Sequence, residues 1–191
     1  MDEPRHATDG WVESLRAVLP ARSRRIIERA ERAAVLVPIV DDGGPLRLVL
    51  TRRTDALPTH QGQVAFPGGS MMTGENDPVI TARREASEEI ALPPESVEIL
   101  GLLDDFLTHT GKVAVTPVVG RIGRLPGLVP APFEVARIFT IPVHDLIQTG
   151  RWSVKEQVWF FEHDGETLWG LSARIVLHLL ELSGFTPPTS L

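Results

Sequence analysis

The stretch from Asp77 to Ile90 restricts the fold more than any other part of the chain, because it predicts one helix with two different faces. Asp77 is a favoured N-cap residue, and Pro78 suits the first helical position, where its missing N–H is not needed. At about 100° per residue, small apolar side chains gather in one arc and carboxylates in another. The apolar face holds Val79, Ala82, Ala86 and Ile90, and the acidic face holds Glu85, Glu88 and Glu89.

The three glutamates of the acidic face repel one another, by roughly 0.2–0.5 kcal/mol for each neighbouring pair in an isolated helix. Hard divalent cations such as Mg²⁺ and Mn²⁺ prefer oxygen ligands and often share them with substrate phosphates, so this face is suited to metal-assisted phosphoryl chemistry. A plain solvated acidic face, with Arg83 and Arg84 as surface partners, is the alternative that the helix alone leaves open.

Runs of β-branched and aromatic residues predict a series of strands around this helix. Two of them, 34–40 and 46–50, flank Asp41-Asp42-Gly43-Gly44 and predict a β-hairpin. A final helix over 172–182 carries an apolar stripe. Helices among irregularly spaced strands predict an α/β (α+β) fold in which helices cover both faces of a mixed sheet. The other predicted strands are 97–103, 112–119, 135–141, 151–161 and 167–169.

The N-terminal segment has apolar residues at spacings that predict two short helices within residues 10–32, separated near Pro20. We expect this segment to pack on the core. The chain is therefore divided into an N-terminal helical segment of residues 1–32, a main domain of residues 33–184 and a flexible tail of residues 185–191.

Size and composition narrow the class of protein. A length of 191 residues fits one domain, and no apolar run approaches the roughly 20 residues that span a bilayer, which excludes an integral membrane protein. The net charge of −6 argues against a broad nucleic-acid surface. Without cysteine, any metal must be held by oxygen or imidazole. The first residues lack the pattern of a secretory signal, so the expected location is the cytoplasm.

Gly69 and the later run Arg84-Glu85-Ala86-Ser87-Glu88-Glu89-Ile90-Ala91-Leu92 resemble the Nudix box of the Nudix hydrolases. In that family the box forms a loop–helix–loop that binds a divalent metal and cleaves a nucleoside diphosphate linked to another group. Two departures are present: Ala91 replaces the usual glycine near the helix end, and the spacing from Gly69 to Arg84 is one residue longer than in the commonest form. Because alanine in a left-handed C-cap costs about 1 kcal/mol or more, we expect the helix to end without that motif.

The sequence ahead of the box is similar to an additional signature of the coenzyme A pyrophosphatase branch of the family. It consists of Val49-Leu50-Thr51-Arg52-Arg53-Thr54, seven further residues, and Gly62-Gln63-Val64-Ala65-Phe66-Pro67-Gly68-Gly69. Pro58 stands where the signature often has an arginine. Segments like this branch continue downstream, so the similarity covers roughly residues 33–182. The resemblance implies a Nudix-type α/β/α sandwich.

The resemblance also implies a role for each polar residue of the box. Glu85 and Glu89 are expected to be the principal metal ligands, and the Gly69 carbonyl an additional ligand. Glu88 is expected to be a further ligand or the base that prepares the water. Arg84 would orient a glutamate through a charge-assisted hydrogen bond.

Residues outside the helix complete the expected site. Gly68 and Gly69 let the backbone approach the substrate without a Cβ atom in the way. Arg52 and Arg53 are expected to point to opposite faces of a strand, so that one of them can meet a substrate phosphate. These four residues are the predicted substrate-binding groups.

Two further features remain open at this stage. A base from outside the box would be Glu134 or Glu156. The apolar arm of coenzyme A needs a channel, and for each candidate for its lining the favoured alternative is core or loop packing. These candidates are Leu57, Phe106, Leu107 and Phe133.

The expected activity is hydrolysis of the pyrophosphate bond of coenzyme A or its derivatives, giving 3′,5′-ADP and 4′-phosphopantetheine, with Mg²⁺ or Mn²⁺ as cofactor. One alternative is the same chemistry on another nucleoside diphosphate derivative, such as ADP-ribose, or on an oxidised nucleoside triphosphate. The other is a catalytically silent nucleotide-binding module. The expected partner is a small nucleotide, not nucleic acid or a membrane, and a homodimer is compatible with the sequence.

Overall fold

The computed structural model describes residues 10–55 and 61–186. Its α-helices are α1 Trp11–Ala21, α2 Pro78–Ile90, α3 Val143–Leu146 and α4 Gly170–Leu182, with short 3₁₀-helices at Pro94–Ser96 and Thr149–Arg151. Its strands are β1 Glu31–Val40, β2 Arg47–Arg53, β3 Val64–Ala65, β4 Gly68–Ser70, β5 Glu98–Leu102, β6 Phe106–Leu107, β7 Val113–Ile122, β8 Val135–Pro142, β9 Trp152–Lys155, β10 Val158–His163 and β11 Glu166–Trp169.

Strand β1 lies at the centre of the main sheet. It runs parallel to β7 along its whole length. On its other side it pairs antiparallel with β2 at one end and with β4 at the other. β2 also pairs with β3 and β8, and β7 also pairs with β5 and β6. The sheet is therefore mixed, and the predicted hairpin of β1 and β2 is confirmed.

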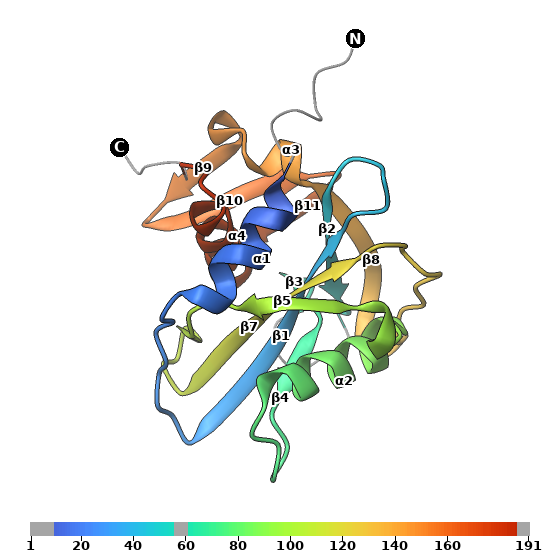
Figure 1. The fold of residues 1–191 in the computed structure, drawn as a ribbon, viewed down its shortest axis with the longest axis vertical. Helices are drawn as coiled ribbons and strands as arrows, with labels where there is room; N and C mark the ends of the chain where they lie inside the picture. Colours follow the sequence, from blue (N-terminus) through green and yellow to red (C-terminus); the bar gives the residue numbers. More distant parts are fainter. Residues whose placement is uncertain (1–9, 56–60, 187–191) are drawn as a thin grey trace.

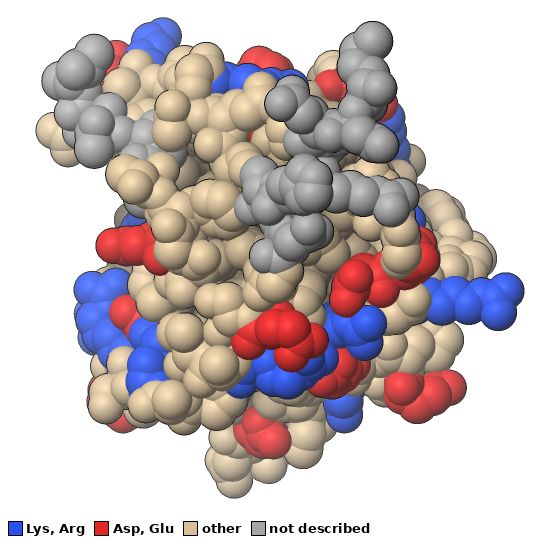
Figure 2. Space-filling model, turned by 45° about the horizontal axis from the view of Figure 1, so that its top comes forward, with Lys and Arg blue, Asp and Glu red and all other residues tan. Residues whose placement is uncertain are grey.

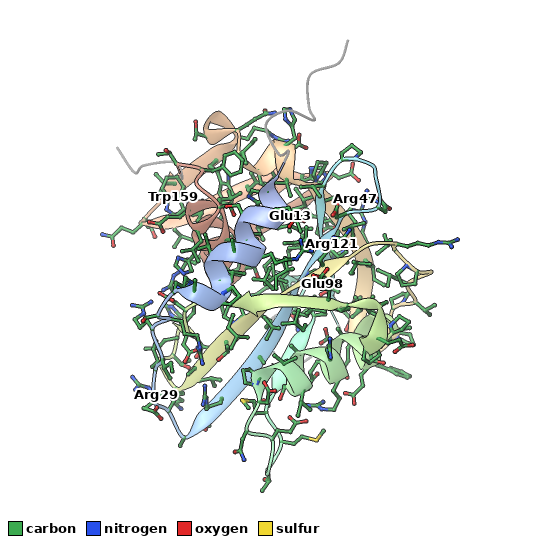
Figure 3. All side chains as sticks on the ribbon, in the orientation of Figure 1. Glu13, Arg29, Arg47, Glu98, Arg121 and Trp159 are labelled. Carbon is green, nitrogen blue, oxygen red and sulfur yellow. The ribbon has the colours of Figure 1, made fainter. Side chains whose placement is uncertain are left out.

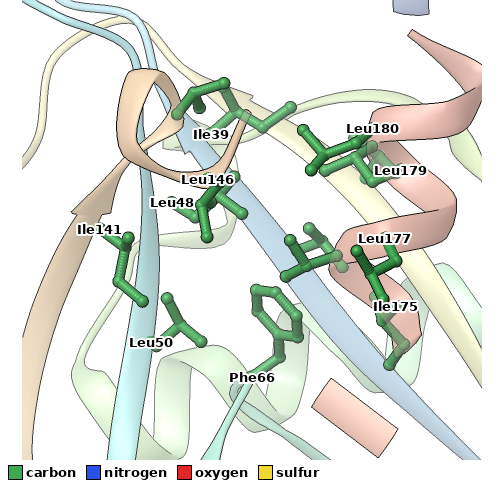
Figure 4. Close-up of a cluster of buried hydrophobic side chains, with 14 of the residues drawn as sticks. Ile39, Leu48, Leu50, Phe66, Ile141, Leu146, Ile175, Leu177, Leu179 and Leu180 are labelled. Carbon is green, nitrogen blue, oxygen red and sulfur yellow. The ribbon is translucent and has the colours of Figure 1, made fainter. Parts of the chain in front are cut away.

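Successive side chains of β1 enter two different cores, because a strand points its residues alternately to opposite faces. Leu36 and Val40 belong to the cluster that contains α2. Val37 and Ile39 belong to the cluster that contains α1, α3 and α4, and Figure 4 shows Ile39 facing leucines of α3 and α4. Figure 1 shows α2 on one side of β1 and α1 with α4 on the other. The predicted α/β/α sandwich is confirmed.

A second sheet consists of β9, β10 and β11 in antiparallel order. The prediction of one strand over 151–161 is wrong, because this segment forms both β9 and β10. Glu156 and Gln157 separate the two strands with left-handed φ angles of 50° and 66°, which suit a tight two-residue hairpin turn. Trp152 and Phe161 face the core from this sheet, with ring centroids 5.0 Å apart.

The N-terminal segment forms one helix, so the prediction of two helices is wrong. After α1, which includes Pro20, the chain has no helix or strand until β1. The buried carboxylate of Asp105 holds this part of the chain in place. It accepts hydrogen bonds from Arg24 Nη1 at 2.7 Å and from Ile27 N at 2.9 Å. Ile26 is 54% exposed, so the apolar spacing that predicted a second helix does not mark a buried face.

Helix α1 packs on the core, as expected for the N-terminal segment. Its buried residues are Trp11, Val12, Leu15 and Leu19. The domain boundaries after residues 32 and 184 stay predictions. Residues 187–191 of the predicted tail lie outside the described residues.

Acidic and basic side chains are mixed on the surface. Figure 2 shows the two kinds interleaved on the face that it presents. In Figure 3, Glu13, Glu98 and Arg121 lie near one another between α1 and β5. Arg16 on α1 binds Glu98 at 2.9 Å, and Arg121 binds Glu98 at 3.4 Å. Within residues 10–55 and 61–186, no helix is long and apolar enough to cross a membrane.

Candidate active site

Local interactions fix helix α2 at both ends. Asp77 accepts a hydrogen bond from Val79 N at 2.9 Å, and Pro78 occupies the first turn, as the sequence predicts. The other end differs from the prediction, because Ala91 adopts a left-handed conformation with φ 52° and ψ 34°. Its N–H donates to the Ser87 carbonyl at 3.1 Å. The hydrogen bonds of the cap thus hold alanine in a conformation that favours glycine.

Glu85 lies directly against the backbone of Gly69. A Cβ atom on Gly69 would come within 2.5 Å of the Glu85 carboxyl carbon. A Cβ atom on Gly68 would instead lie 2.4 Å from the Ala34 carbonyl oxygen on β1. The two glycines are therefore needed for different reasons, Gly68 for strand packing and Gly69 for the approach of a carboxylate. Burial raises the pKa of Glu85, and the hydrogen bond from Arg84 opposes this rise.

Glu89 is the most buried carboxylate of α2, with 4% of its surface exposed. Its Oε2 accepts a hydrogen bond from Gly68 N at 3.2 Å, and its Oε1 lies 4.0 Å from Arg53 Nη1. Burial raises the pKa of Glu89 to about 7, although the Gly68 N–H and the Arg53 charge act in the opposite direction. A cation beside Glu89 would favour its charged form at neutral pH.

Arg84 binds the other carboxylates of the site. Its guanidinium donates to Glu75 at 3.0 Å, to Glu85 at 2.7 Å and to Glu88 at 3.2 Å. Thr81 Oγ1 also donates to Glu75, at 2.7 Å. The Arg84 guanidinium, the largest of several causes, lowers the pKa of Glu75 to about 2. Arg84 is thus within hydrogen-bond distance of the glutamates that its predicted role requires.

Sequence analysis did not single out Glu75. The residue lies in the polar loop between β4 and α2, where the sequence shows an acidic side chain but no spacing that links it to the helix. The contact with Arg84 depends on the loop folding back onto the helix, which no sequence spacing shows.

The two arginines at the end of β2 point to opposite faces, as strand alternation predicts. Arg53 faces α2, and its buried Nε has no hydrogen-bond partner among residues 10–55 and 61–186. Arg52 lies between Asp55 at 3.2 Å and Glu166 at 3.9 Å. Arg53 is therefore the arginine on the side of the α2 carboxylates.

Glu134 lies in the turn that precedes β8, close to the same carboxylates. Burial is the largest cause of the raised pKa of Glu85 and of Glu89, and repulsion by Glu134 contributes to both. Thr54 N holds this turn by donating to the Glu134 carbonyl at 3.0 Å. Glu156, the other candidate base, lies in the hairpin turn between β9 and β10.

The candidates for an apolar channel lie in different surroundings. Phe106 is 6% exposed and belongs to the core, and Leu107 is partly buried on β6. Phe133, by contrast, is 85% exposed beside Glu134. Leu57 and Pro58 lie outside the described residues. A continuous channel therefore stays a prediction.

Comparison with known proteins identifies the family of this site. The NUDIX domain matches residues 30–160, a range that contains Glu75, all three glutamates of α2 and Glu134. The chain belongs to the Nudix family. Because the matched range begins with the first strand of the main sheet, the Nudix domain supplies the central sheet, α2 and both glycines of β4.

Two relatives that are named as Nudix hydrolases align with most of this chain. It is 35% identical over 179 residues to the uncharacterised Nudix hydrolase NudL of Photorhabdus laumondii, covering 90% of this chain and 95% of the relative. It is 39% identical over 165 residues to NudL of Yersinia pestis, covering 78% of each. The protein is therefore a Nudix hydrolase.

Solved Nudix structures share its fold. RenU, a Nudix hydrolase from M. smegmatis, has a TM-score of 0.58 at 20% identity, covering 86% of this chain and 92% of that one. A binary complex of C. elegans Ap4A hydrolase has a TM-score of 0.51 at 21% identity, covering 61% and 83%. At these identities the likeness shows the Nudix fold alone.

Nudix hydrolases generally use divalent metal ions. The oxygen atoms predicted to bind metal, those of the Glu85, Glu88 and Glu89 carboxylates and of the Gly69 carbonyl, suit a hard cation by their chemistry. In the described part of the chain, no three acidic or histidine side chains are already gathered around a common point for an ion. Arg84 instead binds Glu85 and Glu88 in this arrangement. Glu89, which is buried beside Gly68, best fits a cation, because a bound cation would offset the cost of burying the negative charge of this carboxylate.

Proposed function

We propose that this Nudix hydrolase cleaves the pyrophosphate bond of coenzyme A or its derivatives, giving 3′,5′-ADP and 4′-phosphopantetheine, with Mg²⁺ or Mn²⁺ as cofactor. One observation carries the proposal: the two halves of the signature that resembles the coenzyme A branch meet beside the carboxylates. Arg53 N donates to the Gln63 carbonyl at 3.0 Å, and Arg52 pairs with Val64. The second half then leads to Gly68, whose N–H binds Glu89.

In the proposed reaction, water attacks one phosphorus of the pyrophosphate bridge and the other phosphate leaves. Glu85, Glu89 and the Gly69 carbonyl would hold the metal ion, which neutralises charge on the phosphate oxygens when bound, and Glu88 would be a further ligand or the base. Arg84 orients the glutamates through the hydrogen bonds described above. Most of the acceleration then comes from positioning and electrostatics rather than from a covalent intermediate.

The proton of the attacking water goes to a carboxylate. Glu88 is the first candidate because its side chain is 58% exposed and can exchange the proton with solvent. Glu134 is the second candidate because it lies in the turn before β8 and its charge acts on the same carboxylates. Arg53 would bind a bridge phosphate from the side of the α2 carboxylates. Arg52 stays a proposed substrate contact on the other face of β2.

A substrate panel tests the proposal. Coenzyme A, dephospho-coenzyme A and ADP-ribose are incubated with the protein and Mg²⁺ or Mn²⁺, and the products are identified by chromatography. We expect coenzyme A to be cleaved with a kcat/KM about tenfold or more above that of dephospho-coenzyme A, because a bound phosphate adds charge-assisted hydrogen bonds. Equal values would indicate another nucleoside diphosphate derivative as the substrate.

Matched variants separate catalysis from a silent binding module. Glu89→Gln should abolish turnover, whereas Glu181→Gln, on α4 with 65% of its side chain exposed, should retain it. Wild-type turnover no higher than that of Glu89→Gln would eliminate the catalytic proposal. The cytoplasmic location and a homodimer also stay proposals, and sedimentation of the purified protein tests the second.

A further inference from the structure

Phe133 is the most exposed large hydrophobic side chain in the described residues, at 85%. A single exposed hydrophobic residue is common on protein surfaces and indicates nothing by itself. The position of Phe133 is what sets it apart. It directly precedes Glu134, whose charge reaches Glu85 and Glu89. The backbone of its turn also contacts helix α2, because Ala131 N donates to the Glu89 carbonyl.

The turn that carries Phe133 is held from two sides. Thr54 Oγ1 donates to the Phe133 carbonyl at 3.1 Å, and Thr54 N donates to the Glu134 carbonyl at 3.0 Å. On the other side, Ala131 N donates to the Glu89 carbonyl at 2.8 Å. The backbone at Phe133 is thus tied both to the end of β2 and to the end of α2. The ring is exposed on a fixed support rather than on a loose loop.

We infer that Phe133 stacks on the base of the nucleotide substrate. Every nucleobase offers a flat π-face to an exposed aromatic ring, and a fixed backbone reduces the entropy lost on binding. The inference rests on the proposed function, which puts a nucleoside diphosphate at the carboxylates. It adds a residue that selects substrates bearing a base, a role separate from hydrolysis.

AMP and ribose 5-phosphate test this role directly, because they share the sugar and the phosphate and differ by the base. Isothermal titration of the full chain with each compound, in the presence of Mg²⁺, gives Kd values that require no turnover. Phe133→Ala should weaken AMP binding about tenfold and leave ribose 5-phosphate unchanged, and Phe133→Trp should restore AMP binding. Val129→Ala is the matched control, because Val129 is 61% exposed in the same loop, and it should bind AMP like the wild type.

Three outcomes overturn the inference. The first is no detectable AMP binding by the wild type. The second is an equal loss for both compounds in Phe133→Ala, which indicates a disturbed phosphate site. The third is equal AMP affinity in the wild type and Phe133→Ala, and if the oligomeric state also changes, the ring is assigned to an interface between copies.

Turnover distinguishes this inference from the proposed function. If the wild type hydrolyses coenzyme A while Phe133→Ala binds AMP normally, only the stacking role fails. If the wild type hydrolyses none of the panel, the proposed function fails, whatever the AMP titration gives.

Discussion

Glu89 is buried, which disfavours its charged form, whereas its proposed role as a metal ligand requires that form. Burial raises its pKa from 4.5 to about 7. Between these values the folded protein binds more protons than the unfolded chain, in which the glutamate is already ionised. The stability of the metal-free protein therefore contains a contribution that falls as the pH rises through this window and is level above about pH 7.

Replacement of Glu89 isolates this contribution. Because of Glu89, the free energy of unfolding of the wild type should fall by about 3 kcal/mol between acidic and slightly alkaline pH. Glu89→Gln should not show this fall. Urea unfolding of both proteins near pH 5 and near pH 8, with a chelator present, measures the difference. Parallel pH dependences in the two proteins would show that the pKa of Glu89 is not raised.

Gly68 and Gly69 allow packing to be tested apart from site geometry. In Gly69→Ala the new Cβ meets the end of the flexible Glu85 side chain, so stability should change by less than about 1 kcal/mol while metal affinity falls about tenfold or more. In Gly68→Ala the Cβ meets the β1 backbone, so the free energy of unfolding should fall by about 2 kcal/mol. Urea unfolding and Mn²⁺ titration measure the two effects. Normal metal binding by Gly69→Ala would contradict the assigned contact.

Helix α2 offers a test at the level of a secondary-structure element. Ala91 is a non-glycine residue with φ 52°, held there by the cap hydrogen bonds. Ala91→Gly removes the steric penalty of the left-handed conformation, so the free energy of unfolding should rise by about 1 kcal/mol. Thermal or urea unfolding measures this change. A variant less stable than the wild type would show that the cap imposes no strain.

Elements with a strong local pattern could be predicted from the sequence. The N-cap at Asp77, the two faces of α2 and the hairpin of β1 and β2 follow from capping residues, periodicity and glycine turns. The elements that were mispredicted depend on tertiary contacts. The segment after α1 resembles a helix in its spacing, yet the carboxylate of Asp105 holds it in another conformation. Likewise, no glycine marks the turn at Glu156 and Gln157.

At the scale of the whole molecule, Asp105 ties the N-terminal segment to the main sheet. It is fully buried and accepts hydrogen bonds from Arg24 and, at 2.7 Å, from Thr116 Oγ1 on β7. Asp105→Ala leaves these donors without their acceptor, so the free energy of unfolding should fall by about 3 kcal/mol. Glu13→Ala is the control, because Glu13 is exposed on α1 and its ion pair with Arg16 should contribute less than about 1 kcal/mol. Similar losses of stability in the two variants would contradict the anchoring role.

The placement of the candidate site residues was largely predictable because one helix carries most of them, whereas their roles stay predictions. Glu85, Glu88 and Glu89 share a face through periodicity alone. Contacts between distant segments were not predictable in the same way. The contact of Glu75 with Arg84 depends on a loop conformation, and the choice of Arg53 over Arg52 as the residue that faces α2 depends on the register of β2. The coenzyme A substrate rests on resemblance and stays a proposal.

The central claim is that the carboxylates of α2 hold a divalent cation beside Gly69. The most direct test is a Mn²⁺ titration of the wild type and of single variants, in which electron paramagnetic resonance measures the bound and free ion. The wild type should bind Mn²⁺ more tightly near pH 8 than near pH 6, because Glu89 must be ionised. Glu85→Gln and Glu89→Gln should each weaken binding about tenfold or more, and Glu181→Gln should leave it unchanged. Wild-type Mn²⁺ affinity in both Glu85→Gln and Glu89→Gln would contradict the claim.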